Sequence, residues 1–461
     1  MEPDSLELEK ILKMPAASPI NTASIAAIIP AYNEEMSIEA SIRSLLAQTR
    51  PPNAVFVIVN NSTDETYYLA LPFVGAHQLI HREEHFTCVV EVIDIGVNAD
   101  RKVGALNFGW TLAQDFDYLL GVDGDTVLDK HCLRGLVAEI VADSRLGGIS
   151  AIYGFDQKAA HGANASFLIR SQRFQFAGFN LDNLLRSRNM AVLGGQCSLL
   201  NTSALKRTML DNHQTTPWVT DSEIEDSLLS VQLKDSGFRT KISATSRADV
   251  GAMDTFRSLH AQQVKWNSGG VELMLQHPLH PNLRLRWREN VGMLTNLLSR
   301  VMFILLVAGA LSIGVFSFLW WWLIPPMVSV LLNVRIGLAI KTHTWKDVAY
   351  ALLFVPAEIY MALRGLHFIQ AWAQVIGRQE HDNWAAQANA ENGRAGSGKG
   401  IFVAIGVLAI LAAVSYGWWH LSSIWQNGIL GVGWIILAVL TIVQTILMLV
   451  KLFRSHHGYS A

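Results

Sequence analysis

The sequence predicts an α/β domain built on a mostly parallel sheet, followed by a C-terminal α-helical membrane domain. Between residues 25 and 122, short apolar runs alternate with amphipathic stretches, which is the pattern of strands joined by helices. Residues 301–334 and 401–450 contain no Asp, Glu, Lys or Arg, although 16% of the whole chain is charged. Charge-free stretches of this length favour helices that cross a bilayer.

Four strands are predicted in the first part of the chain, each a buried apolar run that ends in a polar turn. They are expected at residues 24–30, 54–59, 89–95 and 118–122. The carboxyl ends of parallel strands meet at one edge of a sheet, and ligands bind there. The loops that follow these strands therefore bring together Tyr32, Asn60, Lys102 and Asp123.

The run Asp123-Gly124-Asp125 directly follows the fourth predicted strand. Two carboxylates at i and i+2 in this place suit a divalent metal that carries a diphosphate. Alone the run is a weak signal, because acidic pairs after strands are common. Further on, a glycine turn at Gly195 leads into another strand, and Glu225-Asp226 lies near the start of a helix, where the helix dipole alone would favour carboxylates.

Five motifs occur in the order and spacing of one known family. Taken together, residues 25–270 resemble the inverting family-2 glycosyltransferases with a GT-A fold, whose membrane-bound branch includes hyaluronan, chitin, cellulose and poly-N-acetylglucosamine synthases. Each motif alone is weak, whereas five in order are a specific signal. They are Pro30-Ala-Tyr-Asn-Glu-Glu35, Lys102-x-Gly-Ala-Leu-Asn107, Asp123-Gly-Asp125, Glu225-Asp226 and Gln262-x-x-Lys-Trp266.

The resemblance implies a donor site for a nucleotide-sugar, expected to be UDP-linked. Lys102 would meet the diphosphate. Asp123 would be the carboxylate on the ribose and metal side, and Asp125 would bind Mn²⁺ or Mg²⁺ directly. A cation and a lysine suit this task because they offset the charge that develops on the leaving diphosphate. The loop that would hold the nucleoside contains Pro30, Tyr32 and Glu34, and the turn after the second strand adds Asn60 and Asn61.

The same resemblance places the catalytic residues at Glu225 and Asp226, with Asp226 as the general base. Inversion requires a base opposite the leaving nucleotide, so that an acceptor hydroxyl can attack the anomeric carbon in line. Gln262, Lys265 and Trp266 match the family's motif beside the acceptor and donor, and Gly195 belongs on that side as well. Trp266 offers a flat apolar face on which a sugar ring can stack.

The chain departs from the family pattern in three places. The turn after the second strand is Asn60-Asn61-Ser62, where the family often has Asp-Asp-Gly-Ser, so an amide would have to recognise the base. Ile224 replaces the Thr of the Thr-Glu-Asp motif. Lys265 replaces an Arg, which keeps the charge but loses the bidentate fork. These changes leave the identity of the nucleotide open.

The composition excludes several other classes of protein. The first 24 residues are polar without an apolar core, so we expect no signal peptide and a cytoplasmic catalytic domain. The three cysteines show neither metal-ligand spacing nor a disulfide framework. A net charge of −2 argues against a nucleic-acid partner.

The second half of the chain predicts a multi-pass membrane protein. A basic, partly apolar stretch from Leu283 to Arg288 suits a helix on the membrane surface, and two hairpins of spans follow. Residues 347–377 either span the bilayer or lie in its interface. We favour four spans plus an interfacial helix, because every cation except Arg335 then falls on the cytoplasmic side, and Arg335 can snorkel there.

Domain boundaries follow from these assignments. We expect an N-terminal extension, the GT-A domain, an interfacial helix or linker, a transmembrane hairpin, an interfacial helix with a cytoplasmic loop, and a second hairpin with a short tail. The corresponding residues are 1–24, 25–275, 276–300, 301–341, 342–399 and 400–461.

Three functions remain open from the sequence. The favoured one is a polysaccharide synthase that extends a growing chain, as a monomer or a homo-oligomer. The alternatives are a transferase that adds one sugar to a lipid acceptor and, more distantly, an inactive membrane scaffold. The joint presence of Asp123, Asp125 and Asp226 argues against the scaffold.

Overall fold

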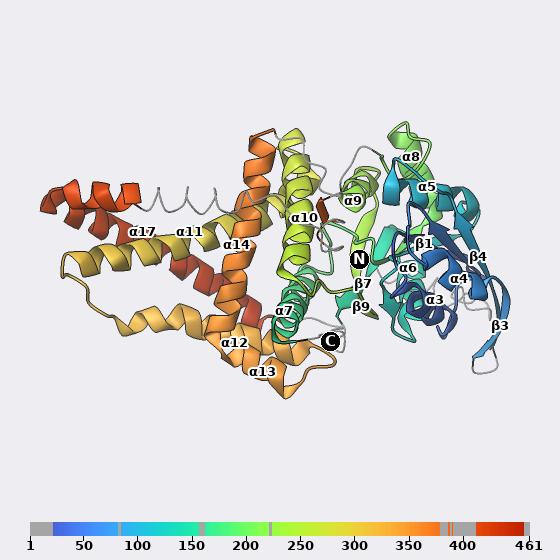
Figure 1. Cartoon of the computed structure of the whole chain (residues 1–461), viewed down its shortest axis with the longest axis horizontal. Helices are drawn as coiled ribbons and strands as arrows, with labels where there is room; N and C mark the ends of the chain where they lie inside the picture. Colours follow the sequence, from blue (N-terminus) through green and yellow to red (C-terminus); the bar gives the residue numbers. More distant parts are fainter. Residues whose placement is uncertain are drawn as a thin grey trace, which may run out of the picture. The chain divides into compact units, whose positions relative to one another are not determined.

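A computed structural model describes residues 22–81, 84–155, 162–220, 224–378, 386–387, 390 and 412–455 of the 461. The chain divides into two compact units, shown in Figure 1. The first comprises Met1–Gly154, Arg188–Asp221 and Glu225–Gly251, and the second comprises Phe155–Ser187, Ser222–Ile224 and Ala252–Ala461. The predicted catalytic segment 25–275 therefore contributes to both units.

The first unit is built on a nine-stranded sheet, within the part of the chain that the structure describes. The strand order is β3-β4-β2-β1-β5-β8-β7-β9-β6. The strands are β1 (Ile25–Ala31), β2 (Ala54–Val59), β3 (Gly75–His81), β4 (Glu84–Asp94), β5 (Tyr118–Val122), β6 (Val127–Leu128), β7 (Leu146–Gly154), β8 (Cys197–Asn201) and β9 (Arg239–Asp249).

The four strands predicted from apolar runs form the parallel core of this sheet. β1 pairs in parallel with β2 and β5, and β2 pairs in parallel with β4. Every residue of β1 and β2 is buried, which is why both read as continuous apolar runs. In register, Ala31 lies beside Val59, and Val59 beside Asp94, so the polar turns that follow them start at one edge.

The rest of the sheet is mixed, and most of its strands have no clear signal in the sequence. β8 runs antiparallel to β5 and β7, while β3 and β6 are antiparallel strands at the two ends of the sheet. β3 alternates between half-buried and exposed residues because successive side chains of a strand point to opposite faces of the sheet. β7 and β9 pair in parallel with two irregularities in register.

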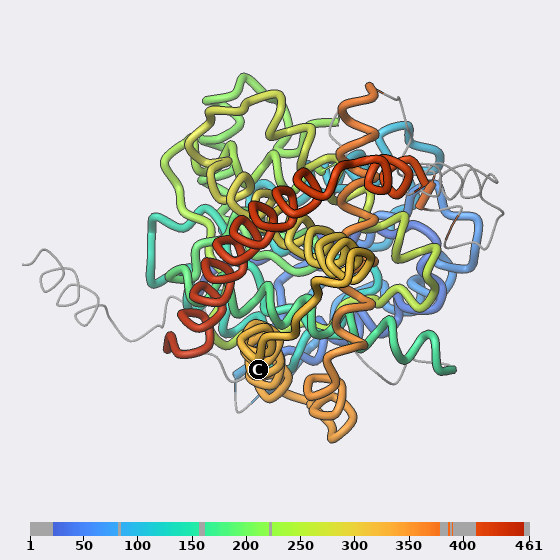
Figure 2. The backbone as a smooth tube through the Cα atoms, turned by 90° about the vertical axis from the view of Figure 1, so that its left-hand side faces the viewer, coloured from blue at the N-terminus to red at the C-terminus, as the bar shows by residue number. Residues whose placement is uncertain are grey.

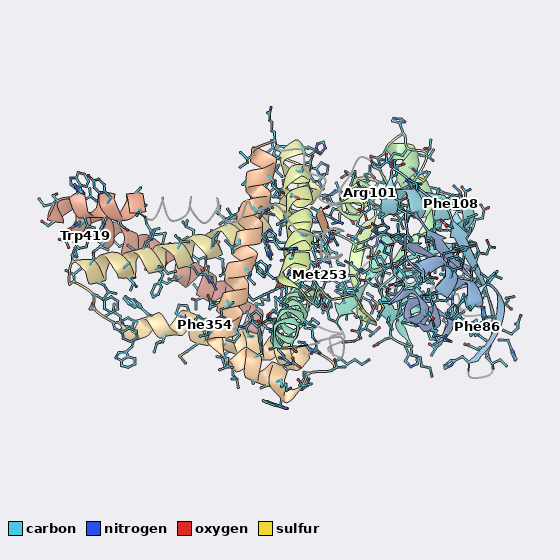
Figure 3. All side chains as sticks on the ribbon, viewed as in Figure 1. Phe86, Arg101, Phe108, Met253, Phe354 and Trp419 are labelled. Atoms are coloured by element: carbon cyan, nitrogen blue, oxygen red, sulfur yellow. The ribbon has the colours of Figure 1, made fainter. Side chains whose placement is uncertain are left out.

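Helices pack on the sheet and border the loops that carry the predicted site residues. They are α3 (Ile38–Leu46), α4 (Thr66–Ala70), the 3₁₀ turn η1 (Leu71–Phe73), α5 (Arg101–Ala113), α6 (Cys132–Val141), α8 (Thr202–Asp211) and α9 (Glu225–Asp235). A Cβ on Gly109 of α5 would lie 2.7 Å from Ile28 Cγ2, so a glycine lets α5 approach β1 closely. This packing holds the N-terminus of α5 in place; Arg101, labelled in Figure 3, is its first residue.

The second unit is helical. Its elements are α7 (Ala163–Leu185), α10 (Phe256–Gln276), η3 (Pro281–Leu283), α11 (Arg284–Ser312), η4 (Trp320–Leu323), α12 (Ile324–Ala339), α13 (Trp345–Leu352), α14 (Phe354–Ile376) and α17 (Ser423–Phe453). Three described segments are long and apolar enough to cross a membrane: Pro281–Ser312, Trp320–Ala339 and Ser423–Phe453. Within the described residues, a fourth candidate crossing is counted only if α13 and α14, which meet at a 77° bend, form one broken span.

Apolar and ionic contacts tie these helices together. α17, red in Figure 2, runs beside α11, and Leu306 of α11 packs in one cluster with Leu430 and Leu437 of α17. Arg300 of α11 makes a bidentate ion pair with Glu358 of α14, at 2.7 and 2.8 Å. Many other side chains of α17 are apolar and exposed, as expected of a surface that faces lipid.

The predicted membrane segments map onto this unit as follows. The surface helix expected before residue 301 and the first span form one continuous helix, α11, which ends at Ser312. The predicted segment 347–377 is the bent pair α13 and α14. Residues 412–420 are helical, while 401–411 of the third predicted span lie outside the described residues.

Candidate active site

The loop after β1 carries the first predicted motif. Pro30 is buried within β1, whereas Tyr32 is 44% exposed. The backbone N–H of Glu34 donates to Thr66 Oγ1 at 2.7 Å, and the Glu34 carboxylate accepts from Ser37. A Cβ on Gly124 would lie 2.7 Å from Glu34 Cγ, so Glu34 packs directly against the Asp-Gly-Asp turn.

The two asparagines after β2 have different environments. The Asn61 side chain forms two hydrogen bonds with the backbone of Asn98: Nδ2 donates to the carbonyl at 2.9 Å, and Oδ1 accepts from the N–H at 2.6 Å. Asn61 thus joins the turn after β2 to the loop that follows β4. Asn60 is 2% exposed, and its Oδ1 has no hydrogen-bond partner among the residues that the structure describes.

Lys102 lies in the first turn of α5 and joins two of the acidic motifs. Its Nζ is 2.7 Å from Asp123 Oδ1 and 3.7 Å from Glu225 Oε1. Burial alone would lower the pKa of Lys102, but the neighbouring carboxylates of Asp123, Glu225 and Asp226 raise it above its usual value. Lys102 is therefore a permanent cation at neutral pH.

Asp125 lies three residues beyond the end of β5, against the backbone after β9. A Cβ on Gly251 would be 2.1 Å from Asp125 Oδ2, so only glycine leaves room for this carboxylate. Ser41 of α3 donates to the Gly124 carbonyl at 2.7 Å and holds the turn. Burial, followed by the charge of Asp123, raises the pKa of Asp125 to about 6.

Asp226 lies in the first turn of α9 and meets the glycine turn before β8. The backbone N–H of Gly195 donates to Asp226 Oδ2 at 2.8 Å. A Cβ on Gly195 would lie 2.6 Å from that oxygen and 3.0 Å from Lys102 Nζ. Burial, followed by the charge of Glu225, raises the pKa of Asp226 to about 8. This carboxyl group is thus poised to exchange a proton near neutral pH.

The site carries a strong excess of negative charge. The carboxylates of Asp123 and Glu225 contact the Lys102 ammonium, and those of Asp125 and Asp226 interact with it electrostatically. The raised pKa values of Asp125 and Asp226 reflect this crowding of carboxylates as well as burial. A divalent cation would relieve the repulsion. In the described residues no group of three or more His, Cys, Asp or Glu side chains is arranged to hold a metal. Mg²⁺-type ions do not need one, because one or two carboxylates and substrate phosphates suffice. Asp125 and Asp123 therefore fit such an ion.

The acceptor-side motif lies in the other unit. Gln262, Lys265 and Trp266 are on α10, where Lys265 is buried and the other two are half-buried. The Trp266 ring lies 6.2 Å from the Phe176 ring of α7, measured between centroids. Five of the predicted site residues, Lys102, Asp123, Gly195, Glu225 and Asp226, are brought together within the first unit.

Two residues that support the site had no functional assignment from the sequence. Asn107 ends the Lys102-x-Gly-Ala-Leu-Asn motif, and its side chain exchanges two hydrogen bonds with the backbone of Trp218, at 2.8 and 3.2 Å. It thereby fixes the loop that leads towards α9. Tyr153 lies in β7 and contacts the glycine turn. The signal for Asn107 was its place in the motif; Tyr153 had none, because β7 was not predicted.

Comparisons with known proteins agree with this geometry. Residues 26–209 match the sequence family described as glycosyl transferase family 2, and residues 118–334 match glycosyl transferase family group 2. The chain is 24% identical over 256 residues to a poly-β-1,6-N-acetyl-D-glucosamine synthase of Staphylococcus epidermidis, covering 55% of this chain and 56% of the relative. The corresponding enzyme of Staphylococcus aureus strain COL is 25% identical over 252 residues, with the same shares. The chain spans about half the length of the curated relatives it matches.

A solved structure is also similar. It is a mannosyltransferase from Pyrobaculum calidifontis in complex with GDP-Man and Mn²⁺, with a TM-score of 0.49 and 16% sequence identity. The similarity covers 81% of this chain and 94% of that one.

Binding of Mn²⁺ to the site should depend on pH. Because the pKa of Asp125 is raised to about 6, its carboxylate is protonated below that pH and competes poorly for a metal. We expect affinity for Mn²⁺ to fall as the pH drops through about 6, when titrations followed by electron paramagnetic resonance at about pH 5 and about pH 7.5 are compared. Asp125→Asn should lose the binding, while Glu91→Gln, at an exposed position of β4, should keep it. Equal affinity at both pH values would contradict the assignment.

Proposed function

The chain is a glycosyltransferase of family 2 with a GT-A-type domain, and on that premise we propose that it transfers a sugar from a UDP-linked donor to a growing polysaccharide, with inversion at the anomeric carbon. One observation carries the proposal. Carboxylates from two segments about a hundred residues apart, Asp123 after β5 and Glu225 in α9, meet at Lys102, within 2.7 and 3.7 Å of its ammonium. The synthases to which the chain is similar support N-acetylglucosamine as the first sugar to test.

The donor end of the site would hold the nucleotide diphosphate. We assign the direct contact with a divalent ion, Mn²⁺ or Mg²⁺, to Asp125, and the side facing the ribose to Asp123. When bound, such an ion would offset the charge on the leaving diphosphate. Lys102 supplies a second positive charge, and it is close enough to exchange Asp123 for a phosphate oxygen.

Asp226 is the proposed general base. Its Oδ2 is held by the Gly195 N–H, so we assign the proton from the acceptor hydroxyl to Oδ1. A pKa of about 8 makes this carboxylate a strong base for its type once it is deprotonated. Glu225 lies beside it near Lys102, and its negative charge contributes to the raised pKa of Asp226. Gln262, Lys265 and Trp266 are proposed to face the acceptor and donor sugars.

Asn60 is the proposed reader of the nucleobase. Its buried Oδ1 is an acceptor without a partner in the described residues, and the ring N–H of uracil would satisfy it. Asn61 is already bonded to Asn98 through both ends of its amide, so its role is to hold the turn. This division of tasks assigns recognition of the base to Asn60, while the choice of a UDP-linked donor comes from the similarity to the synthases.

Contacts within the helical unit support a topology with four crossings. Near the start of α11, Glu289 pairs with Arg186 of the loop after α7, and Asn290 accepts from Trp372 of α14. Arg300, just before the charge-free stretch, pairs with Glu358 at the other end of α14. Both ends of α14 therefore lie beside the polar first half of α11. This supports an interfacial α14 that does not cross the bilayer.

The C-terminal end of α17 lies on the same side. Lys451 pairs with Asp182 of α7 at 2.6 Å, and Arg335 of α12 donates to the carbonyls of Leu452 and Arg454 at 2.6 and 2.8 Å. α7 is not one of the described segments that are long and apolar enough to cross a membrane, so its side of the bilayer serves as the reference for the ends of α12 and α17. We propose that this side is the cytoplasm.

The central experiment screens nucleotide-sugars for Mn²⁺-dependent release of UDP and then tests Asp226→Asn. The variant should bind donor as the wild type does and lose transfer by about a thousandfold, because it lacks the base. Wild-type transfer should increase with pH as Asp226 deprotonates and level off above about 8. Glu91→Gln serves as the matched carboxyl-to-amide control on an exposed strand position. Unchanged transfer in Asp226→Asn refutes the assigned base, and a lipid carrying a single sugar refutes the polysaccharide product.

Asn60→Ala should weaken UDP binding by about tenfold, the effect of one lost buried hydrogen bond. Isothermal titration with UDP and with GDP measures both the loss and the preference between the two bases. Asn61→Ala should instead lower the melting temperature, since it removes both bonds to Asn98. If Asn60→Ala binds UDP as tightly as the wild type does, Asn60 does not read the base.

A reporter fused after Ser455 should be cytoplasmic, because α17 ends beside α7. Alkaline phosphatase there should be inactive and a fluorescent protein should be bright. The same reporters inserted at Gly314, between α11 and α12, should give the opposite pattern. An exported C-terminus would exclude four crossings.

A further inference from the structure

The glycine turn that holds Asp226 is itself held by a buried tyrosine. Tyr153, in β7, is 5% exposed, and its hydroxyl lies between strands β7 and β8. The hydroxyl donates to the Gly194 carbonyl at 3.0 Å and accepts from the backbone N–H of Cys197 at 3.3 Å. Ser150 Oγ lies 2.5 Å from the same oxygen. One oxygen atom thus bridges both ends of the turn Gly194–Cys197.

The phenolic proton has two acceptors within reach, the Gly194 carbonyl at 3.0 Å and the Cys197 carbonyl at 3.3 Å, of which Gly194 is the nearer. Burial raises the pKa of Tyr153 above its usual value, so the hydroxyl keeps its proton and can donate it to Gly194. The Cys197 N–H donates to the phenolic oxygen, and the Ser150 hydroxyl forms a further hydrogen bond with it. The Gly194 carbonyl also accepts from Ser198 Oγ at 2.6 Å.

The same turn is hydrogen-bonded to Asp226, the proposed base. The residue after Gly194 is Gly195, whose N–H donates to Asp226 Oδ2 at 2.8 Å. On the other side of the turn, the Leu193 N–H donates to Ser230 Oγ, which in turn donates to the Asp226 carbonyl at 2.6 Å. Asp226 is therefore clamped through its side chain and its backbone, and the side-chain clamp depends on where the turn lies.

The absence of side chains at the turn makes its position critical. A Cβ on Gly194 would be 2.9 Å from the Tyr153 hydroxyl, and a Cβ on Gly195 would be 2.6 Å from Asp226 Oδ2. The backbone of the turn therefore packs closely against the Tyr153 hydroxyl on one side and the Asp226 carboxylate on the other. A shift of a few tenths of an ångström at Gly194 would be transmitted to the bond at Gly195.

We propose that Tyr153 is a positioning residue of the transfer reaction, which orients the Asp226 carboxylate through the Gly194–Gly195 turn. The proposal rests on the function proposed above, in which Asp226 is the base. Tyr153 touches neither donor nor acceptor in this scheme, so it acts on the turnover step and leaves donor binding alone. Its sequence position gives no hint of this role, because the link is made through a backbone carbonyl.

Tyr153→Phe removes only the hydroxyl and is the direct test. We expect kcat to fall about tenfold, which is the effect of losing one buried hydrogen bond. The donor KM should be unchanged, because the bond affects the transfer step and not donor binding. Tyr118→Phe is the matched control, since Tyr118 is half-buried at the opposite, amino-terminal end of β5. It should leave kcat and KM as in the wild type.

A double-mutant cycle shows whether the tyrosine acts through the base. In the Asp226→Asn background, Tyr153→Phe should cause no further loss, because the group it orients is gone. A second tenfold loss in that background, or an equal loss in Tyr118→Phe, would overturn the proposal. A rise in KM with kcat unchanged would also overturn it.

Hydrogen exchange tests the linkage without relying on catalysis. In Tyr153→Phe, the peptide covering residues 192–199 should exchange faster, because the Cys197 amide loses its acceptor and the Gly195 amide is no longer held in place beside Asp226. If that exchange is unchanged, the positioning role is wrong even where transfer is detected. If exchange accelerates but no nucleotide-sugar is consumed by the wild type, the linkage stands and the proposed function fails. Should Tyr153→Phe fold poorly, Ser198→Ala removes the other hydroxyl bond to Gly194 and should accelerate the same peptide.

Discussion

The contact between the Lys102 ammonium and carboxylates from distant segments is the constraint on which the site depends. Asp123 and Glu225 both lie within reach of Lys102 Nζ, and Asp125 and Asp226 crowd in beside them. Such a concentration of negative charge is costly in a buried place unless cations offset it. It explains why glycines stand at 195 and 251, where any side chain would collide with a carboxylate. The carboxylates also outnumber the one ammonium group of Lys102, and a bound divalent ion would supply the positive charge that offsets them.

The sheet positions the polar turns of the site, whereas the helical unit carries the apolar segments that suit a membrane. The parallel core of the sheet buries β1 and β2 completely, which fixes the edge where the polar turns begin. The helical unit places its ionic contacts, such as Arg300–Glu358 and Lys451–Asp182, next to the ends of the charge-free stretches 301–334 and 401–450. Charges at those levels anchor the helices and leave their middles apolar, which suits a protein that sits in a bilayer and works at its surface.

The pattern of apolar residues along the chain predicted those strands that are apolar throughout. The apolar runs at 54–59 and 118–122 became β2 and β5 with the same bounds, because a strand buried on both faces is apolar throughout. β7 and β9 were not assigned, since β9 mixes polar and apolar residues and is stabilised by pairing with β7. Helix α11 begins earlier than the predicted span, because the basic stretch at its start is helical as well and adds polar turns to an apolar helix.

By itself, the sequence determined the family, the order of the acidic motifs and the apolar segments, since each is written in residues close together along the chain. The tertiary structure alone decided which amide of the Asn60-Asn61 pair is engaged, which carboxylates Lys102 meets, and that Tyr153 supports the turn beside Asp226. The physical reason is the same in each case. These are hydrogen bonds and ion pairs between groups tens to more than a hundred residues apart, several of them to backbone atoms, which every residue type carries and no sequence pattern marks.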